Sequence, residues 1–221
     1  RHEMIGRGGF GLVYRAYDRK LGRFVAVKVP HRSTLDDGSN RRRVEREAAA
    51  TARLRHPHIV TLHDFIASGA HSLLINELIE GETLAQFLAR FPQGCEVRVA
   101  ATVVQRIAQA VQHAHDHNVL HRDIKPSNIL LDTTVADGEL PFCPRLTDFG
   151  VARILRDDDV TETSWQFVGT WHYTPPELLD YKPDGHTRAS DIYSLGVVFY
   201  ELLAGRRPFD ATVPGNLHNQ I

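Results

Sequence analysis

The sequence has few cysteines and no excess of charge of either sign. Its 221 residues include two cysteines, Cys95 and Cys143, whose spacing fits neither a disulfide framework nor a zinc motif. Lys and Arg together number 26 and Asp and Glu 27, so the formal net charge is −1. This balance provides no basic surface for nucleic acid or an anionic membrane, and we expect neither partner. The cysteine content favours a reducing compartment, so we expect a cytoplasmic protein or the cytoplasmic domain of a longer one.

Long hydrophobic runs are also missing. The longest apolar stretch, 192–204, is shorter than the roughly 20 residues of a membrane-spanning helix and contains Ser194 and Glu201. We therefore expect a buried helix there and no membrane span. No signal peptide is recognisable and the first residue is Arg1, so we expect the chain to begin within a longer protein. With 42% hydrophobic and 24% charged residues, the composition is that of a folded globular protein.

Hydrophobic patterns divide the chain into a sheet-rich first part and a helical second part, with a boundary expected at 78–82. In the first part we predict a hairpin of 5–13 and 24–29 around a turn at 18–22. A helix over 39–55, with Glu47 on its apolar side, and strands at 59–66 and 72–78 follow. In the second part we predict a helix over 97–117 and a short hairpin with strands at 129–131 and 145–147. Residues 148–174 lack periodicity, which is typical of a functional loop.

Three glycines near the start, Gly6, Gly8 and Gly11, form a G-x-G-x-x-G pattern. Such a loop lets backbone amides approach a phosphate, because no side chain intervenes. The pattern alone is a weak signal, and an ordinary glycine turn is the alternative. A dinucleotide-binding fold is disfavoured, because it needs a helix directly after the glycines, whereas 12–17 reads as a strand.

Lys28 lies in the apolar strand Phe-Val-Ala-Val-Lys-Val, where an unpaired ammonium is costly to bury. It needs an anion, such as a phosphate together with a carboxylate. Glu47 on the next predicted helix is the candidate carboxylate. Taken singly, each of these two residues is more often a solvated surface charge.

The most specific pattern is 121–128, which reads His-Arg-Asp-Ile-Lys-Pro-Ser-Asn. It brings Asp123, Lys125 and Asn128 within eight residues, and Asp148-Phe149-Gly150 supplies a second carboxylate further on. The oxygen ligands of Asn128 and Asp148 suit Mg²⁺, while Asp123 is a separate carboxylate suited to accept a proton. With two lysines for phosphate, these are the parts of a phosphoryl-transfer site.

Taken in order along the chain, these motifs resemble those of a protein kinase domain, and the resemblance covers essentially all 221 residues. It includes the glycine loop, Val25-Ala26-Val27-Lys28, His121-Arg122-Asp123, Asp148-Phe149-Gly150 and Pro175-Pro176-Glu177. The resemblance implies an α+β, bilobal fold. Residues 1–79 would form a small, mainly antiparallel β lobe with one key helix, and 80–221 a larger helical lobe with the catalytic and activation loops.

The resemblance also implies an activity. The chain would be a serine/threonine protein kinase that transfers the γ-phosphate of ATP, with Mg²⁺ or alternatively Mn²⁺, to protein substrates. Lys125, two residues after Asp123, and Gly169-Thr170 ahead of Pro176-Glu177 resemble the serine/threonine branch more than the tyrosine branch. A pseudokinase that serves as a nucleotide-binding scaffold is disfavoured, because such a protein normally loses one of the catalytic charged residues.

Individual roles follow from the same resemblance. Asp123 would orient and deprotonate the substrate hydroxyl, and Lys125 would neutralise charge on the transferred phosphoryl group. Lys28, held by Glu47, would contact the α and β phosphates. The metal ligands would be Asn128 and Asp148. The other residues expected around the nucleotide form the glycine loop, the adenine sandwich and the hinge: Ile5, Gly6, Gly8 and Gly11, then Val13, Ala26 and Leu130, then Glu77 and Ile79.

The sequence also predicts structural roles for residues outside the nucleotide site. Asp191 would brace the backbone around His121 and Arg122, whereas His113, His115 and His117 would lie at the surface or act as caps. Asn76 stands just before the hinge, where the family has a bulkier apolar residue. The spacing between Asn128 and Asp148 is longer than usual, which predicts an extended surface hairpin at 136–144.

Two expectations concern regulation and completeness. Thr161, Thr163 and Ser164 are candidate phosphorylation sites whose phosphate would pair with Arg122. Members of the family continue with several more helices after the one matching 192–204, and an arginine there pairs with the residue matching Glu177. A buried Glu177 without that arginine would be costly, and the helix at 192–204 would lose its cover and expose an apolar face. We therefore expect residues 1–221 alone to be a poorly stable, weakly active fragment.

Overall fold

The computed structural model describes residues 3–8, 11–30, 38–68, 71–149, 171–179 and 185–209. The chain forms two compact units. Arg1–Arg55 and Ile59–Ile79 belong to the first, and His56–His58, Glu80–Phe149 and the described residues after 167 belong to the second. The turn His56–His58, which the sequence assigns to the first lobe, therefore joins the second unit.

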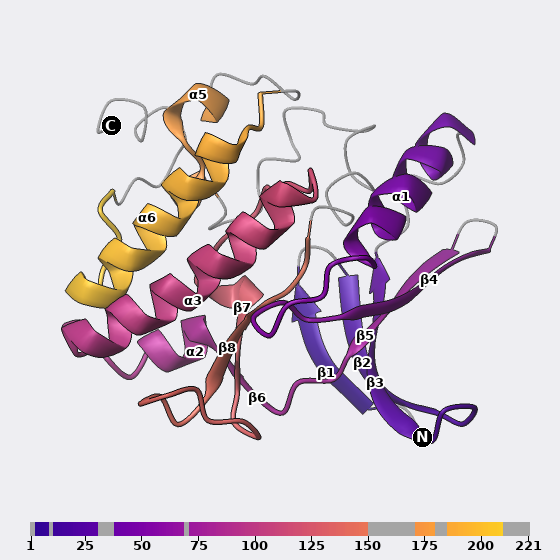
Figure 1. Ribbon diagram of the computed structural model, residues 1–221, viewed down its shortest axis with the longest axis horizontal. Coiled ribbons are helices and arrows are strands. Elements are labelled where there is room, and N and C mark those ends of the chain that lie inside the picture. Colours follow the sequence, from indigo (N-terminus) through magenta and orange to yellow (C-terminus); the bar gives the residue numbers. More distant parts are fainter. Residues whose placement is uncertain are drawn as a thin grey trace. The chain divides into compact units, whose positions relative to one another are not determined.

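The first unit is a five-stranded antiparallel sheet with one helix beside it (Figure 1). The strands are β1 (Glu3–Gly8), β2 (Gly11–Asp18), β3 (Arg23–Pro30), β4 (Leu62–Ser68) and β5 (His71–Glu77). Their order is β1-β2-β3-β5-β4, with a turn between β2 and β3 where the sequence predicts one. This sheet confirms the predicted antiparallel β lobe.

The helix of this unit, α1 (Gly38–Thr51), ends four residues earlier than predicted. Beyond Thr51 the amide groups of Arg53 and Leu54 bond to carbonyls three residues back, so the last turn tightens and stops. Pro57 then follows, which disfavours helical geometry in the residue before it. Leu54 is still buried, but it reaches the core from this turn instead of from the helix.

The second unit is mainly helical. The long helices α3 (Val97–Asp116) and α6 (Arg188–Ala204) lie side by side (Figure 1). A small antiparallel sheet has the order β6 (Gly81–Thr83), β7 (Ile129–Asp132), β8 (Cys143–Leu146). The short elements are α2 (Leu84–Leu88), the 3-10 helices η1 (Pro126–Asn128) and η3 (Trp171–Tyr173), and α5 (Pro176–Leu179).

The apolar residues that predict α3 form its buried side. They recur every three or four positions, which places them on one face of a helix. The fully buried ones include Ala100, Val103, Ile107, Ala110 and Ala114. The predicted range 97–117 is thus confirmed to within one residue.

The helix predicted as buried, α6, is buried on one side only. Leu195, Val198 and Leu202 lie in the core, whereas Ile192 and Leu203 are exposed. No helix within the described ranges is long and apolar enough to cross a membrane.

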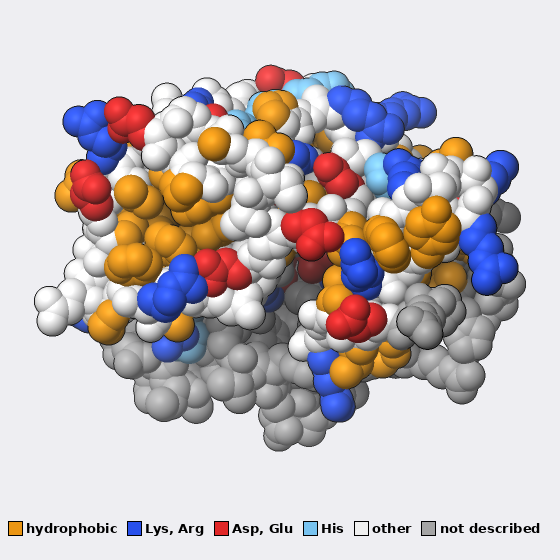
Figure 2. Space-filling view, turned by 90° about the horizontal axis from the view of Figure 1, so that it is seen from below, with side chains coloured by type: hydrophobic (Ala, Val, Ile, Leu, Met, Phe, Trp, Pro, Cys, Tyr) orange, Lys and Arg blue, Asp and Glu red, His pale blue; other side chains and the backbone are white. Residues whose placement is uncertain are grey.

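The connection between β7 and β8 is less exposed than a surface hairpin. Asp137 and Leu140 exchange two backbone hydrogen bonds of 3.1 Å, which close a tight turn. Leu140 and Phe142 after it are buried, so this part of the predicted surface hairpin packs into the unit. On the face shown in Figure 2, side chains of both charges are interspersed with hydrophobic ones, in keeping with the balanced composition.

Two glycines, one inside α6 and one at its C-terminal end, provide a test of how this helix ends and packs. Gly205 caps the helix with φ = 66°, and a Cβ there would lie 2.3 Å from the carbonyl oxygen of Pro92. We expect Gly205→Ala to lower the free energy of unfolding by at least about 1 kcal/mol, from left-handed backbone strain alone.

The matched control is Gly196→Ala inside the same helix. A Cβ at Gly196 meets no atom of the described chain within 4 Å. Because alanine restricts the unfolded chain more than glycine does, this change should raise the free energy of unfolding by about 0.5 to 1 kcal/mol. Urea denaturation measures both variants, and equal effects of the two would contradict the assigned cap.

Candidate active site

In the segment 121–128, the predicted catalytic residue Asp123 contacts both the predicted catalytic residue Lys125 and the predicted metal ligand Asn128. Lys125 Nζ lies 2.8 Å from Asp123 Oδ2. Asn128 Nδ2 donates to the same oxygen at 3.0 Å and to the Asp123 carbonyl at 2.8 Å. Among the described residues both of these side-chain contacts go to Oδ2. The short helix η1 places Asn128 for these contacts, because Pro126 suits its first turn.

The second predicted carboxylate, Asp148, follows directly on a residue tied to this segment. Thr147 donates its amide to the Asn128 carbonyl at 2.9 Å, and its own carbonyl lies 2.9 Å from His121 Nε2. Since a carbonyl can only accept, Nε2 of His121 carries the hydrogen. Phe149, one residue further on, is buried with its ring 4.7 Å from that of His121.

Backbone strain is concentrated at the same place. Asp148 has φ = 66° and Arg122 has φ = 68°, a region that residues with a Cβ seldom adopt. Such geometry costs about 1 to 2 kcal/mol per residue and persists only where surrounding contacts enforce it. Strained residues are frequent at functional sites. Here one of them, Arg122, directly precedes Asp123, and the other, Asp148, is the second predicted carboxylate.

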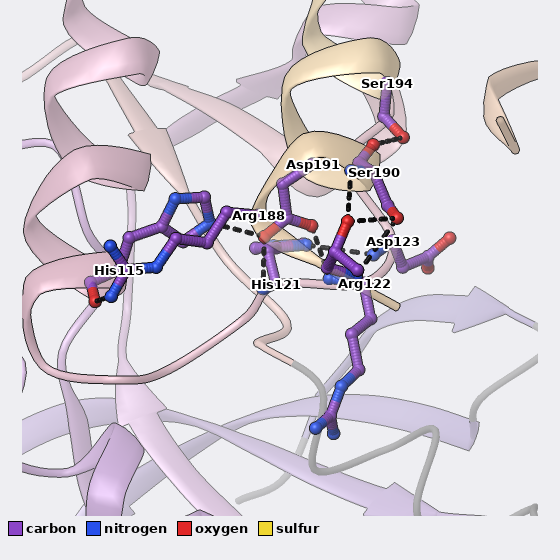
Figure 3. A network of polar contacts seen from close by, with 9 residues as sticks. His115, His121, Arg122, Asp123, Arg188, Ser190, Asp191 and Ser194 are labelled. Carbon is purple, nitrogen blue, oxygen red and sulfur yellow. Dashed lines mark hydrogen bonds and ion pairs between the residues drawn. The ribbon is translucent and has the colours of Figure 1, made fainter. Parts of the chain in front are cut away.

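Asp191 of α6 supplies the contacts that hold the strained backbone at Arg122 (Figure 3). Its side chain is 2% exposed. Oδ2 accepts from the amide of His121 at 2.9 Å, and Oδ1 accepts from the amide of Arg122 at 2.8 Å. The predicted bracing role of Asp191 is therefore confirmed. Its position in the first turn of the helix adds the favourable interaction of a carboxylate with a helix N-terminus.

His115 completes this network and was assigned wrongly from the sequence. It is buried on α3, with Nε2 2.8 Å from Asp191 Oδ2, so it is neither a surface residue nor a cap. The carbonyl of His115 in turn accepts from Arg188 Nη2 at 2.7 Å. Its carboxylate partner lies on another helix, 76 positions along the chain, which no local spacing could reveal.

A pocket of about 440 Å³ lies next to the catalytic segment, with Lys125 and Ser127 in its lining. On its other side Tyr173 Oη donates to Glu201 Oε2 at 2.5 Å. Burial, together with the adjacent Glu201 carboxylate, raises the pKa of the Tyr173 phenol far above its usual range. Tyr173 therefore stays protonated and keeps Glu201 in place at every ordinary pH. Neither residue was singled out from the sequence.

The predicted nucleotide-binding residues are divided between the two units. In the first, Lys28 of β3 is 5% exposed and pairs in register with Val13 of β2 and Leu74 of β5. Ala26 pairs with Asn76, the polar residue before the hinge, and Glu47 is half-buried on α1. Leu130 lies in β7 of the second unit.

The glycine loop and hinge positions also lie in the first unit. Gly6 pairs with Val13, and Gly8 with Gly11. A Cβ at Gly11, which has φ = 139°, would lie 2.1 Å from the carbonyl oxygen of Val29, so this position requires glycine. The other predicted members are Ile5, which is exposed in β1, Glu77 at the end of β5, and Ile79 at the end of the segment Ile59–Ile79.

Two further expectations concern phosphorylation and stability. The candidate phosphorylation sites Thr161, Thr163 and Ser164 lie outside the described residues. Glu177 is exposed, with one oxygen 3.5 Å from Ser190 Oγ. A buried Glu177, one of the two grounds for the predicted instability, is therefore not observed, and the instability itself stays a prediction.

The donor chemistry of the site fits the metal that the motifs imply. Asn128 and Asp148 offer carboxamide and carboxylate oxygens. Mg²⁺ prefers such hard oxygen ligands, whereas softer metals prefer nitrogen or sulfur ligands. The hydrogen bond from Thr147 to the Asn128 carbonyl keeps these two ligand-bearing segments together.

Comparison with known proteins gives one consistent result. Residues 1–221 match the family model described as the protein kinase domain. The chain is 38% identical over 219 residues to the serine/threonine-protein kinase pkn2 of Myxococcus xanthus, covering 98% of this chain and 25% of that protein. It is 38% identical over 208 residues to the serine/threonine-protein kinase PrkC of Bacillus subtilis, covering 94% of this chain and 30% of that protein. It is 39% identical over 213 residues to the serine/threonine-protein kinase PknA of Mycobacterium tuberculosis, covering 93% of this chain and 46% of that protein. The chain thus spans less than half the length of these relatives.

The Asp191 network predicts a large effect on stability. Asp191→Asn should lower the free energy of unfolding by about 2 to 5 kcal/mol, because an amide cannot accept with both side-chain atoms and one buried donor loses its partner. Chemical denaturation measures the change. Asp116→Asn at the exposed end of α3 is the control and should stay within about 0.5 kcal/mol of wild type. A similarly small change at Asp191 would contradict the network.

Proposed function

The chain belongs to the protein kinase domain family, and on that premise we propose that it catalyses transfer of the γ-phosphate of ATP to serine or threonine hydroxyls of protein substrates. The observation that carries the proposal is the contact of Asp123 with both Lys125 and Asn128. Phosphoryl transfer depends on positioned charges more than on covalent chemistry. A carboxylate held by an ammonium and a carboxamide beside a pocket provides such positioning.

In the proposed reaction the hydroxyl oxygen of the substrate forms a bond to the γ-phosphorus as the bond to the β-γ bridging oxygen breaks and ADP leaves. The hydroxyl proton passes to Asp123 Oδ1. Lys125 donates to an oxygen of the moving phosphoryl group, which spreads its negative charge. Its present contact with Asp123 Oδ2 holds the ammonium within reach of that position.

The metal ligands of the proposal are Asn128 and Asp148. When bound, Mg²⁺ neutralises phosphate charge and orients the phosphates for in-line displacement. The chain's own contribution is to keep two oxygen ligands at fixed positions, Asn128 through its bonds to Asp123 and Asp148 through the anchored Thr147. We take Mg²⁺ as the working ion, with Mn²⁺ as an alternative.

For the nucleotide we propose the residues that the family motif assigns. Lys28 would bind the α and β phosphates with Glu47 as its carboxylate partner, beneath the glycine loop of Gly6, Gly8 and Gly11. The remaining contacts would come from the adenine and hinge positions: Ile5, Val13, Ala26, Leu130, Glu77 and Ile79. The burial of the Lys28 ammonium supports this assignment, because a buried cation requires an anionic partner.

Protein substrates are supported by the pocket of about 440 Å³ beside Lys125, whose lining includes the polar side chains of Ser127, Glu201 and Arg207. The names of the relatives specify serine/threonine kinases. The pseudokinase alternative has no observation in its favour, since the three catalytic side chains of 121–128 are present and in contact. Activation by phosphorylation at Thr161, Thr163 or Ser164 stays a prediction.

The role of Asp123 can be tested by Asp123→Asn in the natural full-length protein. We expect turnover to fall by about 10² to 10⁴-fold, because the amide cannot take the proton, while the dissociation constant for ATP stays close to wild type. Transfer of labelled phosphate to a generic basic protein measures turnover. Asp116→Asn is the control for loss of an acidic side chain. Undiminished turnover of Asp123→Asn would disprove the assigned role.

The role of Asp148 predicts a different signature. Asp148→Asn removes one anionic metal ligand, so ATP affinity should become weaker in Mg²⁺ while affinity in EDTA is unchanged. Calorimetric titration with and without the metal separates the two. The assignment of Asp148 as a metal ligand fails if the variant binds ATP as wild type does in both buffers.

A further inference from the structure

A second cluster of metal-binding side chains lies away from the catalytic segment, in the second unit. His58 comes from the turn before β4, Asp137 from the turn between β7 and β8, and Cys143 from the start of β8. One ligand atom from each residue can be chosen so that all three lie within 4.8 Å of one another. His58 and Cys143 are buried and Asp137 is half-buried.

Backbone hydrogen bonds hold all three positions independently of any metal. The carbonyl of His58 accepts from the amide of Leu146 at 2.9 Å, which attaches the turn to β8. Asp137 is held by its two bonds to Leu140. The cluster is thus a preformed arrangement of three separate segments.

The His58 ring is oriented so that the lone pair of one ring nitrogen lies on the side of the Asp137 carboxylate. Nδ1 lies 3.0 Å from the carbonyl oxygen of Pro144, which can only accept, so Nδ1 carries the hydrogen. Nε2 therefore has a lone pair, and it lies 3.8 Å from Asp137 Oδ2. That separation is too long for a hydrogen bond and places two acceptors face to face. The Cys143 sulfur lies 3.5 Å from Nδ1 of the same ring. One of the two ring nitrogens lies within 4.8 Å of both this sulfur and an Asp137 oxygen.

One imidazole, one thiol and one carboxylate form a donor set typical of zinc and disfavoured by Mg²⁺ or Ca²⁺. Zinc–ligand bonds of about 2.0 to 2.3 Å place tetrahedral ligand atoms roughly 3.3 to 3.8 Å apart. A nitrogen–oxygen pair on tetrahedral zinc is about 3.3 to 3.5 Å apart, so the observed 3.8 Å between Nε2 and Oδ2 is a few tenths of an ångström too long. A small inward shift of the two side chains brings both atoms to bonding distance.

Two arginines lie near the cluster, and each contacts a carboxylate. Arg106 Nε donates to Asp137 Oδ2 at 2.8 Å, and Arg145 Nε lies 3.0 Å from Asp132 Oδ2. Arg106 can keep its hydrogen bond as the outer partner of a metal-bound carboxylate, an arrangement that orients such ligands. With a divalent ion, the Cys143 thiolate, the Asp137 carboxylate and the Arg106 guanidinium, the site would carry a net charge of only +1.

We propose that His58, Asp137 and Cys143 form a zinc-type transition-metal site that joins the His56–His58 turn to the β7–β8 connection and β8. On binding, Cys143 releases its thiol proton to solvent and the thiolate, the imidazole Nε2 and the carboxylate bond to the ion. Three protein ligands leave a fourth position for water. The site is independent of the kinase activity.

Cobalt(II) is the probe, because tetrahedral cobalt bound to a thiolate absorbs strongly in the near ultraviolet. The tag-free full-length protein, kept reduced and with excess Mg²⁺ to occupy the active site, is titrated with Co²⁺. We expect one equivalent with thiolate-to-cobalt absorption, which added Zn²⁺ abolishes. Cys143→Ala should remove this absorption and Cys95→Ala, which changes the other cysteine, should retain it.

A second variant keeps the test decisive if Cys143→Ala does not fold. Asp137→Asn preserves the size of the side chain and should weaken Co²⁺ binding by at least about tenfold. It should also remove the rise in melting temperature that Zn²⁺ gives the wild-type protein. The proposal is overturned if wild type shows no thiolate absorption, if the absorption follows Cys95, or if Asp137→Asn binds Co²⁺ as tightly as wild type.

Discussion

One buried carboxylate holds the candidate active site in shape. Asp191 accepts hydrogen bonds from two consecutive amides, at His121 and Arg122, and a third contact from His115. The strained backbone at Arg122 has no regular secondary structure to support it, so these bonds from α6 determine the direction in which the chain continues to Asp123. Without the carboxylate, buried N–H groups would lose their partners, and an unpaired buried donor costs more than the bond itself contributes.

The catalytic side chains are connected to this anchor through a short series of contacts. His121, fixed by Asp191, bonds to the carbonyl of Thr147, and the Thr147 amide bonds to Asn128, which in turn holds Asp123. The proposed general base Asp123 and the segments that carry the proposed metal ligands therefore belong to one network within a single unit. Prearranged charges of this kind need no reorganisation during the reaction, which is the main source of catalysis in phosphoryl transfer.

Local sequence patterns predicted much of the fold and of the candidate site. The features that they did not predict depend on contacts between residues distant in sequence. The helix α3 and the segment 121–128 could be predicted because periodicity and close spacing carry their information. The end of α1 depended on a tightened last turn before Pro57, and the burial of His115 on a carboxylate from another helix. The same limit applies to Cys143, whose spacing to Cys95 suggests no metal, although the fold brings it to His58 and Asp137.

The claim that Asp191 positions the catalytic segment is tested most directly by the rate of a single phosphoryl transfer. Asp191→Asn in the full-length protein, with ATP prebound and below the melting temperature of the variant, is mixed with substrate and quenched at short times. A misplaced Asp123 should slow the transfer step by roughly 10²-fold, while the ATP dissociation constant remains near that of wild type. A folded variant that transfers phosphate at the wild-type rate would contradict the account.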